Sequence, residues 1–260
     1  MTAAPPVGVI GGSGFYSLLD GAEQVRVPTP YGEPSEDLTV GEIRGRQVAF
    51  VPRHGAAHRF PPHRVPYRAN LWALRSLGVS QVVSLSAVGS LHPSLPAGSL
   101  VVPDQIADRT WGREYTYFDT ADGVAHSSFA DPYCRRIRGV AIGTGQAAAT
   151  DGTLVVINGP RFSSRAESLE YQSHGWRIIG MTAMPEAALA RELGLCYATL
   201  ALVTDLDAGV EAGEGVTHRA VLAAFAASLP RLREFLLATI ADLPAEPDGC
   251  GCAEVTRAVR

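Results

Sequence analysis

The sequence has 260 residues, of which 46% are hydrophobic and 18% charged, and its formal net charge is −4. This composition supplies a large core, and the charge argues against nucleic acid or an acidic membrane as the main partner. No apolar run approaches the roughly 18 residues that span a bilayer, and the first residues do not resemble a secretory signal. Because Cys134 and Cys196 fall in expected core segments, we expect a reduced, cytoplasmic protein.

The chain shows no repeats and no linker, so we treat residues 1–244 as one domain. Residues 245–260 are rich in Pro and Gly and are predicted to form a poorly ordered tail. Cys250 and Cys252 form a C-G-C in this tail. That spacing also fits a redox clip or half a metal site, but the tail is the favoured interpretation.

The first predicted strand, residues 7–10, runs into Gly11-Gly12-Ser13-Gly14. Glycines after a strand let backbone N–H groups converge on an anion, and Ser13 adds a hydroxyl donor. The alternative is a tight turn with no ligand. A dinucleotide site is not favoured, because the last glycine of its fingerprint is missing.

Strands are expected at 38–43 and 48–51, and the second ends in Pro52-Arg53-His54-Gly55. The fork of the Arg53 guanidinium matches the oxygens of a phosphate, although a surface salt bridge is the alternative. His54, His58 and His63 do not favour a metal. The prolines between them break the spacing, and no acidic or thiol partner lies nearby in the sequence.

Further helices and strands follow in chain order. A helix at 67–77 leads to a strand at 82–85 that ends in Ser86-Ala87. Strands are expected near 100–102 and 154–157, with a helix beginning at Asp131-Pro132 and a loop at 141–152 between them. The serines of the G-P-R-F-S-S-R-A-E-S motif, which starts at Gly159, are expected to cap the next helix.

Residues 178–209 are the centre of the predicted fold. A short strand ends at Met181 and Thr182, a helix follows to Gly194, and a fully buried strand covers 195–203. We expect a right-handed parallel unit, whose shared carboxyl edge places Met181 and Thr182 near Asp205 and Asp207. After a loop to residue 215, a long helix is expected that Pro230 kinks or splits.

Polar groups therefore gather at one predicted edge of the sheet. They are Ser13, Arg53, His54, Ser86 and Thr182, and together they suit a phosphate. Asp205 and Asp207 cannot bind the same anion, so they face another part of the ligand. This arrangement indicates a displacement in which phosphate attacks while the acids hold the leaving group.

Motifs of one known family occur in the same order along nearly the whole chain: G-V-I-G-G-S-G-F-Y, P-R-H-G, Y-R-A-N-L-W-A-L, S-A-V-G-S-L, G-P-R-F-S-S-R-A-E-S, M-T-A-M-P-E and T-D-L-D-A-G. On these motifs the chain resembles the purine nucleoside phosphorylase and methylthioadenosine phosphorylase family, and most of all its methylthioadenosine branch. The resemblance implies a single α/β domain with a mixed, largely parallel twisted sheet, partly barrel-like and flanked by helices. It also implies a homotrimer or a dimer of trimers.

The resemblance further implies the roles of individual residues. Phosphate is expected at Ser13, Arg53, His54, Ser86, Ala87 and Thr182. Met181 is expected against the ribose, with Phe162 and Ser163 around the base. Asp205 and Asp207 are expected to read N7 and the 6-amino group of a purine.

The 5′ end of the nucleoside is where the sequence departs from the family pattern. His126 and Phe129 are expected to reach the 5′ pocket of a neighbouring subunit. Ala208-Gly209 replaces a bulkier pair, and His218 stands where methylthio-specific relatives have an aliphatic residue. His218 therefore favours a general purine nucleoside phosphorylase narrowly over a strict 5′-methylthioadenosine phosphorylase, the alternative.

The expected reaction is reversible phosphorolysis of purine nucleosides, preferably 6-amino, to free base and (deoxy)ribose 1-phosphate. Asp205 is assigned as proton donor and Asp207 as its support, although the reverse assignment is open. Inorganic phosphate is a co-substrate, and no cofactor or metal is expected. A nucleoside hydrolase, a dinucleotide-dependent oxidoreductase and a non-catalytic nucleotide-binding module are the other classes considered.

Overall fold

The computed structural model describes residues 4–12, 19–119, 125–210, 217–247 and 249–257. Its ten strands form one mixed sheet in the order β2-β3-β4-β1-β5-β9-β8-β7, with β10 paired to β5 and β6. The strands are β1 (Val7–Gly11), β2 (Asp20–Val25), β3 (Leu38–Ile43), β4 (Arg46–Pro52), β5 (Gln81–Ser90), β6 (Leu100–Val101), β7 (Gln105–Arg109), β8 (Thr153–Ile157), β9 (Ile178–Gly180) and β10 (Cys196–Leu206).

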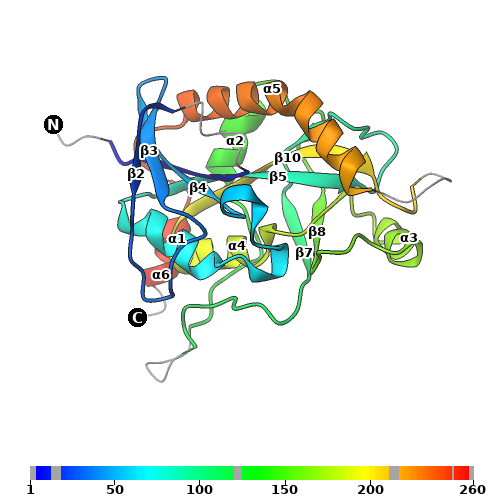
Figure 1. Cartoon of the computed structure of the whole chain (residues 1–260), viewed down its shortest axis with the longest axis horizontal. Helices are drawn as coiled ribbons and strands as arrows, with labels where there is room; N and C mark the ends of the chain where they lie inside the picture. Colours follow the sequence, from blue (N-terminus) through cyan, green and yellow to red (C-terminus); the bar gives the residue numbers. More distant parts are fainter. Residues whose placement is uncertain (1–3, 13–18, 120–124, 211–216, 248, 258–260) are drawn as a thin grey trace.

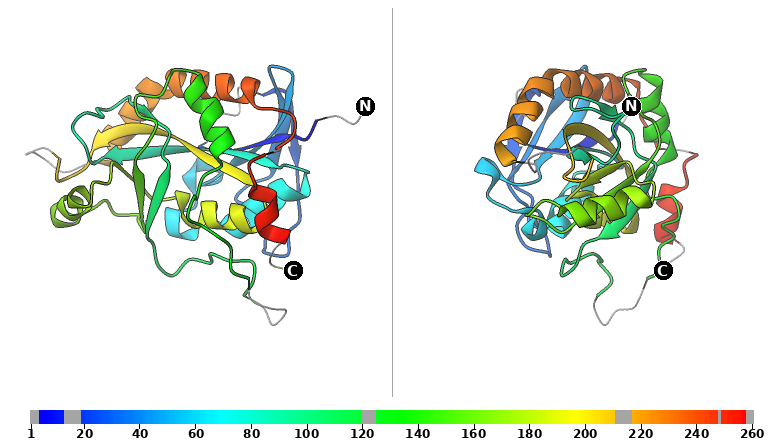
Figure 2. Two further views of the ribbon diagram at one scale, coloured as in Figure 1. Left: turned by 180° about the vertical axis from the view of Figure 1, so that it is seen from behind. Right: turned by 90° about the vertical axis from the view of Figure 1, so that its right-hand side faces the viewer.

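Helices cover both sides of the central strands β5 and β10. The helices are α1 (Tyr67–Ser76), α2 (Arg135–Gly143), α3 (Arg165–Ser173), α4 (Ala183–Glu192), α5 (His218–Asp242) and α6 (Cys252–Arg257), with short 3₁₀ turns at Ala56–His58 and Pro62–Arg64. In Figure 1, α5 and α2 lie on one side of β5 and β10, and α1, α4 and α6 lie on the other. The views in Figure 2 show the same arrangement. The expected α/β fold with a mixed, helix-flanked sheet is confirmed.

β10 is buried on both faces because α5 and α2 pack on one face and α4 packs on the other. From Cys196 to Thr204 its residues are buried, as the continuous apolar run predicts. Phe235 and Leu236 of α5 are almost completely excluded from solvent. β10 and the helix faces that pack on it form the core, and the loops of the site extend from this core.

One edge of β5 is shared by two strands that run in opposite directions. Along its other edge, β5 pairs in parallel with β10 over its whole length. On the shared edge, β1 pairs in parallel as far as Ser84, and β9 pairs antiparallel at Gly89 and Ser90. Between these two pairings, residues 85–88 have no neighbouring strand on this edge among the described residues. This edge of β5 is therefore free of strand pairing there, and its one exposed residue is Ala87.

The predicted parallel unit of β9, α4 and β10 was wrong. β9 runs antiparallel to β5, whereas β10 runs parallel to it. β9 is only three residues long and pairs with the end of β5, so the chain enters the sheet from the opposite direction. As a result, Met181 and Thr182 come back toward the middle of β5 and still lie near Asp205.

Other element boundaries differ from the predictions. α2 begins at Arg135 after Cys134, not at Asp131-Pro132, and it continues to Gly143. α5 is one continuous helix despite Pro230, although it bends along its length in Figure 1. β2 and β7 were not predicted, because their polar, partly exposed sequences lack an apolar pattern.

The chain end after the domain was expected to be a poorly ordered tail. Within it, residues 252–257 form α6, which packs against α4, and Cys252 is buried. None of the described helices is long and apolar enough to cross a membrane.

Candidate active site

A cavity of about 720 Å³ opens beside the unpaired stretch of β5. Its wall includes ten of the predicted site residues: Arg53, His54, Ala87, Phe162, Ser163, Met181, Thr182, Asp205, Asp207 and His218. Gly12 also lines it, but the neighbouring Ser13 lies outside the described residues. The antiparallel β9 and the parallel β10 thus bring both predicted halves of the site to one cavity.

Three predicted residues do not line this cavity. Ser86 is buried, and its hydroxyl has no hydrogen-bond partner among the described residues. His126 is exposed, and Phe129 packs half-buried against the core. Their expected roles, Ser86 toward phosphate and the other two in a neighbouring subunit, remain predictions.

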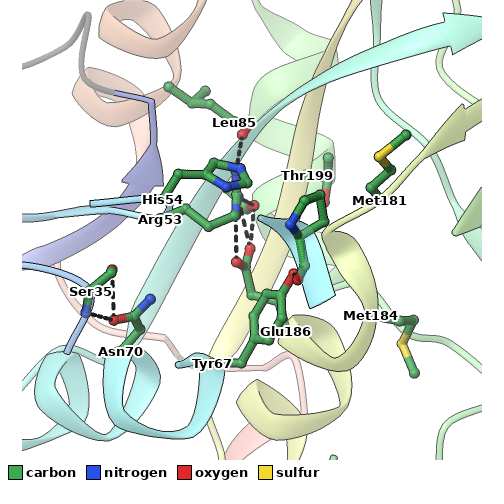
Figure 3. Close-up of polar contacts among 12 residues, drawn as sticks. Ser35, Arg53, His54, Tyr67, Asn70, Leu85, Met181, Met184, Glu186 and Thr199 are labelled. Carbon is green, nitrogen blue, oxygen red and sulfur yellow. Dashed lines mark hydrogen bonds and ion pairs between the residues drawn. The ribbon is translucent and has the colours of Figure 1, made fainter. Parts of the chain in front are cut away.

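Arg53 follows β4 and is bound to a carboxylate that the sequence did not suggest as its partner. Its Nε and Nη2 donate to Glu186 at 2.7 and 3.0 Å, so the pair is bidentate. Both residues are almost completely buried. Figure 3 shows the guanidinium lying over this carboxylate at the foot of the site. The alternative of a surface salt bridge is therefore excluded, because the pair is internal.

The Arg53–Glu186 pair is completed by neutral partners from β5 and β10. Arg53 Nη1 donates to Leu85 O at 2.9 Å, and Nη2 donates to Ser84 Oγ at 2.6 Å. Glu186 Oε1 also accepts from the hydroxyls of Ser84 and Tyr197. Four of the five guanidinium N–H groups are thus used within the protein. The remaining N–H, on Nη1, is the one left for an anion in the cavity.

Glu186 could not be recognised from the sequence as part of this network. Its position in the first turn of α4 indicates a charge near a helix N-terminus, which is commonly exposed. The signal that was available is the strand Cys196–Leu206, whose continuous apolar run shows that α4 packs against a buried sheet. A carboxylate on the inner face of such a helix needs a cation, and Arg53 supplies it.

His54 stands beside the pair as a neutral imidazole. Its Nδ1 lies 2.8 Å from Phe60 O, and since a carbonyl only accepts, Nδ1 carries the proton. Burial, together with the charge of Arg53, lowers the pKa of His54 to about 4. Nε2 is then an acceptor at neutral pH, suited to a protonated phosphate oxygen.

Thr182 and Ala87 lie where β9 returns to the middle of β5. Thr182 precedes α4, and its hydroxyl does not cap that helix. Ala87 is the one exposed residue of β5. A hydroxyl and an open strand backbone therefore face the cavity next to Arg53 and His54, as a phosphate site requires.

Asp205 is held against β5 by a local irregularity. The register between β10 and β5 shifts between Val203 and Asp205, which re-aims the side chains that follow. Thr204 Oγ1 donates to Asp205 Oδ1 at 2.8 Å. A Cβ at Gly89 would lie 3.0 Å from Asp205 Oδ2, so glycine is the residue that leaves room for the carboxylate.

The two carboxylates of the site differ in their surroundings. Burial raises the pKa of Asp205 to about 6, and the charge of Asp207 adds to this shift. Burial also raises the pKa of Asp207, opposed by the hydroxyl of Ser168. Asp207 Oδ2 is buried and has no hydrogen-bond partner among the described residues. Asp205 is thus suited to hold a proton, and Asp207 presents an acceptor to the cavity.

Arg113 connects the segments that carry Met181 and Phe162, the residues expected at the ribose and the base, and sequence reasoning did not identify it. This buried arginine donates to Met181 O at 2.9 Å and, through Nη2, to Asn158 O at 2.7 Å. Its Nε donates to Asn158 Oδ1 at 3.1 Å. Phe162 and Ser163 follow Asn158, and the next helix begins at the capping box of Ser164 and Glu167, as predicted.

The mouth of the cavity is formed by the first turns of α5. His218 lies there beside three apolar residues, Val221, Leu222 and Phe225. His58 also lines the cavity and stacks on His54, and partial burial with the charge of His218 lowers the pKa of His58. His218 is exposed in the single chain, yet it borders the cavity.

The buried ion pair leads to a prediction about stability. Arg53→Ala leaves the Glu186 carboxylate buried without its cation, and we expect the free energy of unfolding to fall by about 3–5 kcal/mol. The double variant Arg53→Met, Glu186→Leu removes both charges and should lose less. Urea unfolding of the three proteins measures this, and an equal loss in the single and double variants would contradict the buried pair.

The raised pKa of Asp205 leads to a second prediction. Below about pH 4 the carboxyl is protonated in both the folded and the unfolded chain, so it carries no penalty. As the pH rises through about 6, the folded state must hold a buried charge. The stability of the natural protein relative to Asp205→Asn should therefore fall between about pH 4 and pH 6 and level off above. Urea unfolding at several pH values checks this, and a constant difference would contradict it.

Comparison with known proteins agrees with this geometry. The family model of the phosphorylase superfamily matches residues 6–241. A purine nucleoside phosphorylase from Streptomyces coelicolor is 55% identical over 258 residues, covering 95% of this chain and 92% of the relative. An S-methyl-5′-thioadenosine phosphorylase from Mycolicibacterium smegmatis is 56% identical over 232 residues, covering 88% of each chain.

A solved structure is similar over nearly its whole length. It is a methylthioadenosine phosphorylase from Schistosoma mansoni in complex with adenine, with a TM-score of 0.90 and 38% identity. The match covers 97% of this chain and 96% of that chain. The expected family is thereby confirmed. The chain belongs to the phosphorylase superfamily and is an enzyme of its purine nucleoside and methylthioadenosine phosphorylase group.

Proposed function

We propose that this enzyme catalyses the phosphorolysis of 6-aminopurine nucleosides, with inorganic phosphate as the attacking group. One observation supports this most strongly. A single cavity has anion-binding groups around Arg53 and Thr182 at one end and the carboxylates of Asp205 and Asp207 at the other. Both ends lie along residues 85–90 of β5, so a phosphate and a nucleoside can bind side by side in this cavity.

At the phosphate end of the cavity, the lining groups are hydrogen-bond donors, except for His54, which is an acceptor. Arg53 offers its remaining N–H, Thr182 its hydroxyl and Ala87 its open backbone, while His54 Nε2 accepts a hydrogen bond from a protonated phosphate oxygen. The expected contributions of Ser13 and Ser86 belong to the same proposal. Because Glu186 already balances the charge of Arg53, the site favours an anion by directed hydrogen bonds more than by net charge.

In the reaction, a phosphate oxygen attacks C1′ of the ribose while the bond to the purine nitrogen breaks. Positive charge develops on the sugar, and the negative charge of the bound phosphate stabilises it. Met181 lies between the two ends and is assigned to the ribose. The backbone contact of Arg113 to Met181 O holds that residue in place, so attack occurs from a fixed position.

At the base end, Asp205 donates a proton to N7 of the leaving purine, and Asp207 accepts from the 6-amino group. The raised pKa of Asp205 supports this division of roles. The unpartnered Oδ2 of Asp207 supports an amino group over a carbonyl oxygen as its partner. Phe162 and Ser163 complete the base site. No cofactor is required for these steps.

At the 5′ end, His218 can hydrogen-bond a hydroxyl, which supports the use of adenosine and other ordinary purine nucleosides. We therefore favour relaxed 5′ specificity. A strict 5′-methylthioadenosine phosphorylase is the second candidate, because Val221, Leu222 and Phe225 present an apolar wall that suits a methylthio group.

A second copy of the chain is part of the proposal. The cavity is open at His218, which is exposed in the single chain. The segment that carries His126 and Phe129 contributes nothing to the cavity of its own chain among the described residues. Trp111 and Tyr115, on the same long loop, are large and exposed. A trimer in which this loop covers a neighbour's 5′ pocket would bury these side chains.

The phosphate requirement is the first functional test. We expect base release only with inorganic phosphate, and ribose 1-phosphate as the sugar product. Thr182→Val removes a hydroxyl from the phosphate end and should raise the KM for phosphate by about tenfold, with a smaller change in the KM for nucleoside. Steady-state kinetics with both substrates varied measures this. Full activity in phosphate-free buffer, with free ribose as product, would indicate a hydrolase.

The base preference is the second functional test. Adenosine should be a better substrate than inosine or guanosine, because an ionised Asp207 repels a 6-oxo group. Asp207→Asn should narrow or invert this preference, since an unpaired polar contact costs about 1–3 kcal/mol. The ratio of kcat/KM values for adenosine and inosine reports it. A faster reaction with guanosine in the natural enzyme would contradict the base-site assignment.

The 5′ specificity is the third functional test. His218→Val should shift the ratio of kcat/KM toward methylthioadenosine over adenosine by about tenfold, the value of one ordinary hydrogen bond. Arg219→Ala changes the next, exposed residue, which does not line the cavity, and serves as the control. If His218→Val leaves the ratio unchanged, His218 has no role in the choice and the strict methylthio candidate becomes the better one.

A further inference from the structure

Far from the active site, the four cysteines of the chain meet at one point. Cys134, Cys196, Cys250 and Cys252 each offer a sulfur, and all four sulfurs lie within 4.8 Å of one another. All four cysteines are free thiols in this structure. Three of them are buried, and Cys250 is half-buried. We call this group the four-cysteine cluster.

Separate parts of the fold hold each member of the cluster. Cys134 immediately precedes α2, and its backbone N–H donates to Tyr197 O at 2.7 Å. Cys196 is the first residue of β10, and its N–H donates to Ser80 O at 2.9 Å. Gly251, at φ +73°, forms the tight turn that lets Cys250 and Cys252 face the same way.

The chain end that carries Cys250 and Cys252 is tied to α2. Arg135 Nη2 donates to Gly249 O at 2.6 Å, and Arg136 Nη1 donates to Glu246 O at 2.7 Å. α6 then packs against α4. The C-G-C segment is therefore placed over the start of β10 by several independent contacts.

The cluster and the active site are at opposite ends of the same strand. Cys196 begins β10 and Asp205 lies near its end, and an extended strand of this length spans about 30 Å. α6 packs against α4, and Figure 1 shows it far from the first turn of α5, whose residues line the cavity. A ligand at the cluster is thus separate from the nucleoside site and acts on the fold.

We propose that the four-cysteine cluster is a structural zinc site that binds one Zn²⁺ through its four sulfurs. Tetrahedral zinc–thiolate bonds of about 2.3 Å place the sulfurs about 3.8 Å apart. The Sγ atoms of Cys196 and Cys250 are 3.3 Å apart, and every pair lies within 4.8 Å, so small shifts of side chains reach this geometry. The proposal departs from the expectation that the protein holds no metal.

The chemistry of the cluster also suits a cation at its centre. Four thiols this close together cannot all lose their protons unless a positive ion lies between them. Zn²⁺ would supply that charge, and the thiol protons would be released to solvent.

The net charge of such a site is also balanced. Four thiolates and one Zn²⁺ carry a charge of about −2. Arg135 and Arg136 follow Cys134 directly, and the N-terminus of α2 adds a partial positive charge at the same place. The metal would join α2, β10 and the C-terminal segment, which are far apart in the sequence.

The test uses the full-length protein purified under reducing conditions from zinc-containing medium. We expect about one zinc per chain by elemental analysis, and release of that zinc when the thiols are titrated with an organomercurial. Cobalt in place of zinc should give the visible absorption of a tetrahedral cobalt–thiolate centre. This readout depends on the ligands and not on catalysis.

Variants separate the site from general stability. Cys250→Ser with Cys252→Ser should lower bound zinc from about one to below about 0.1 per chain and lower the melting temperature. Ala253→Ser alters an exposed neighbour, keeps all four thiols and should keep the zinc. Two results would overturn the proposal. One is a natural protein with four reduced thiols and no zinc. The other is a mass lower by two hydrogens for each of two disulfides, again without zinc.

Discussion

The bidentate ion pair between Arg53 and Glu186 is the interaction on which the site depends. It joins the end of β4 to the first turn of α4, and its neutral partners, Ser84 and Tyr197, come from β5 and β10. A charge buried this deeply is tolerated only with its partner and with its remaining donors satisfied. The pair therefore fixes how these four elements meet beneath the cavity.

Above this pair, the fold divides the cavity into two chemical halves along β5. β1 leaves the shared edge at Ser84, and β9 joins it at Gly89, so the intervening stretch has no strand partner on this edge and is exposed at Ala87. The groups near Ala87 suit an anion, whereas the bulge of β10 turns Asp205 toward Gly89. Arg113 ties the segments bearing Met181 and Phe162 together. Two parts of a substrate are thus held at a fixed separation.

The sequence predicted the residues that border the cavity more accurately than the strand topology that brings them together. Apolar runs and the residues that follow them identified Arg53, Thr182 and Asp205, because strand ends are local features. The direction of β9 was missed, since three residues carry no signal for parallel or antiparallel pairing. Glu186 was missed as a partner of Arg53, and the convergence of Cys134 and Cys252 was also missed. Such contacts join distant parts of the chain, which only the folded topology brings together.

The division of the cavity into a phosphate half and a base half can be tested by one crystal structure with adenine and sulfate bound, sulfate standing in for phosphate. The account predicts sulfate beside Thr182 and the backbone of Ala87. It predicts adenine against Phe162, with N7 within hydrogen-bonding distance of Asp205 and the amino group at Asp207. Adenine bound beside Arg53, or bound without contact to either aspartate, would contradict the account.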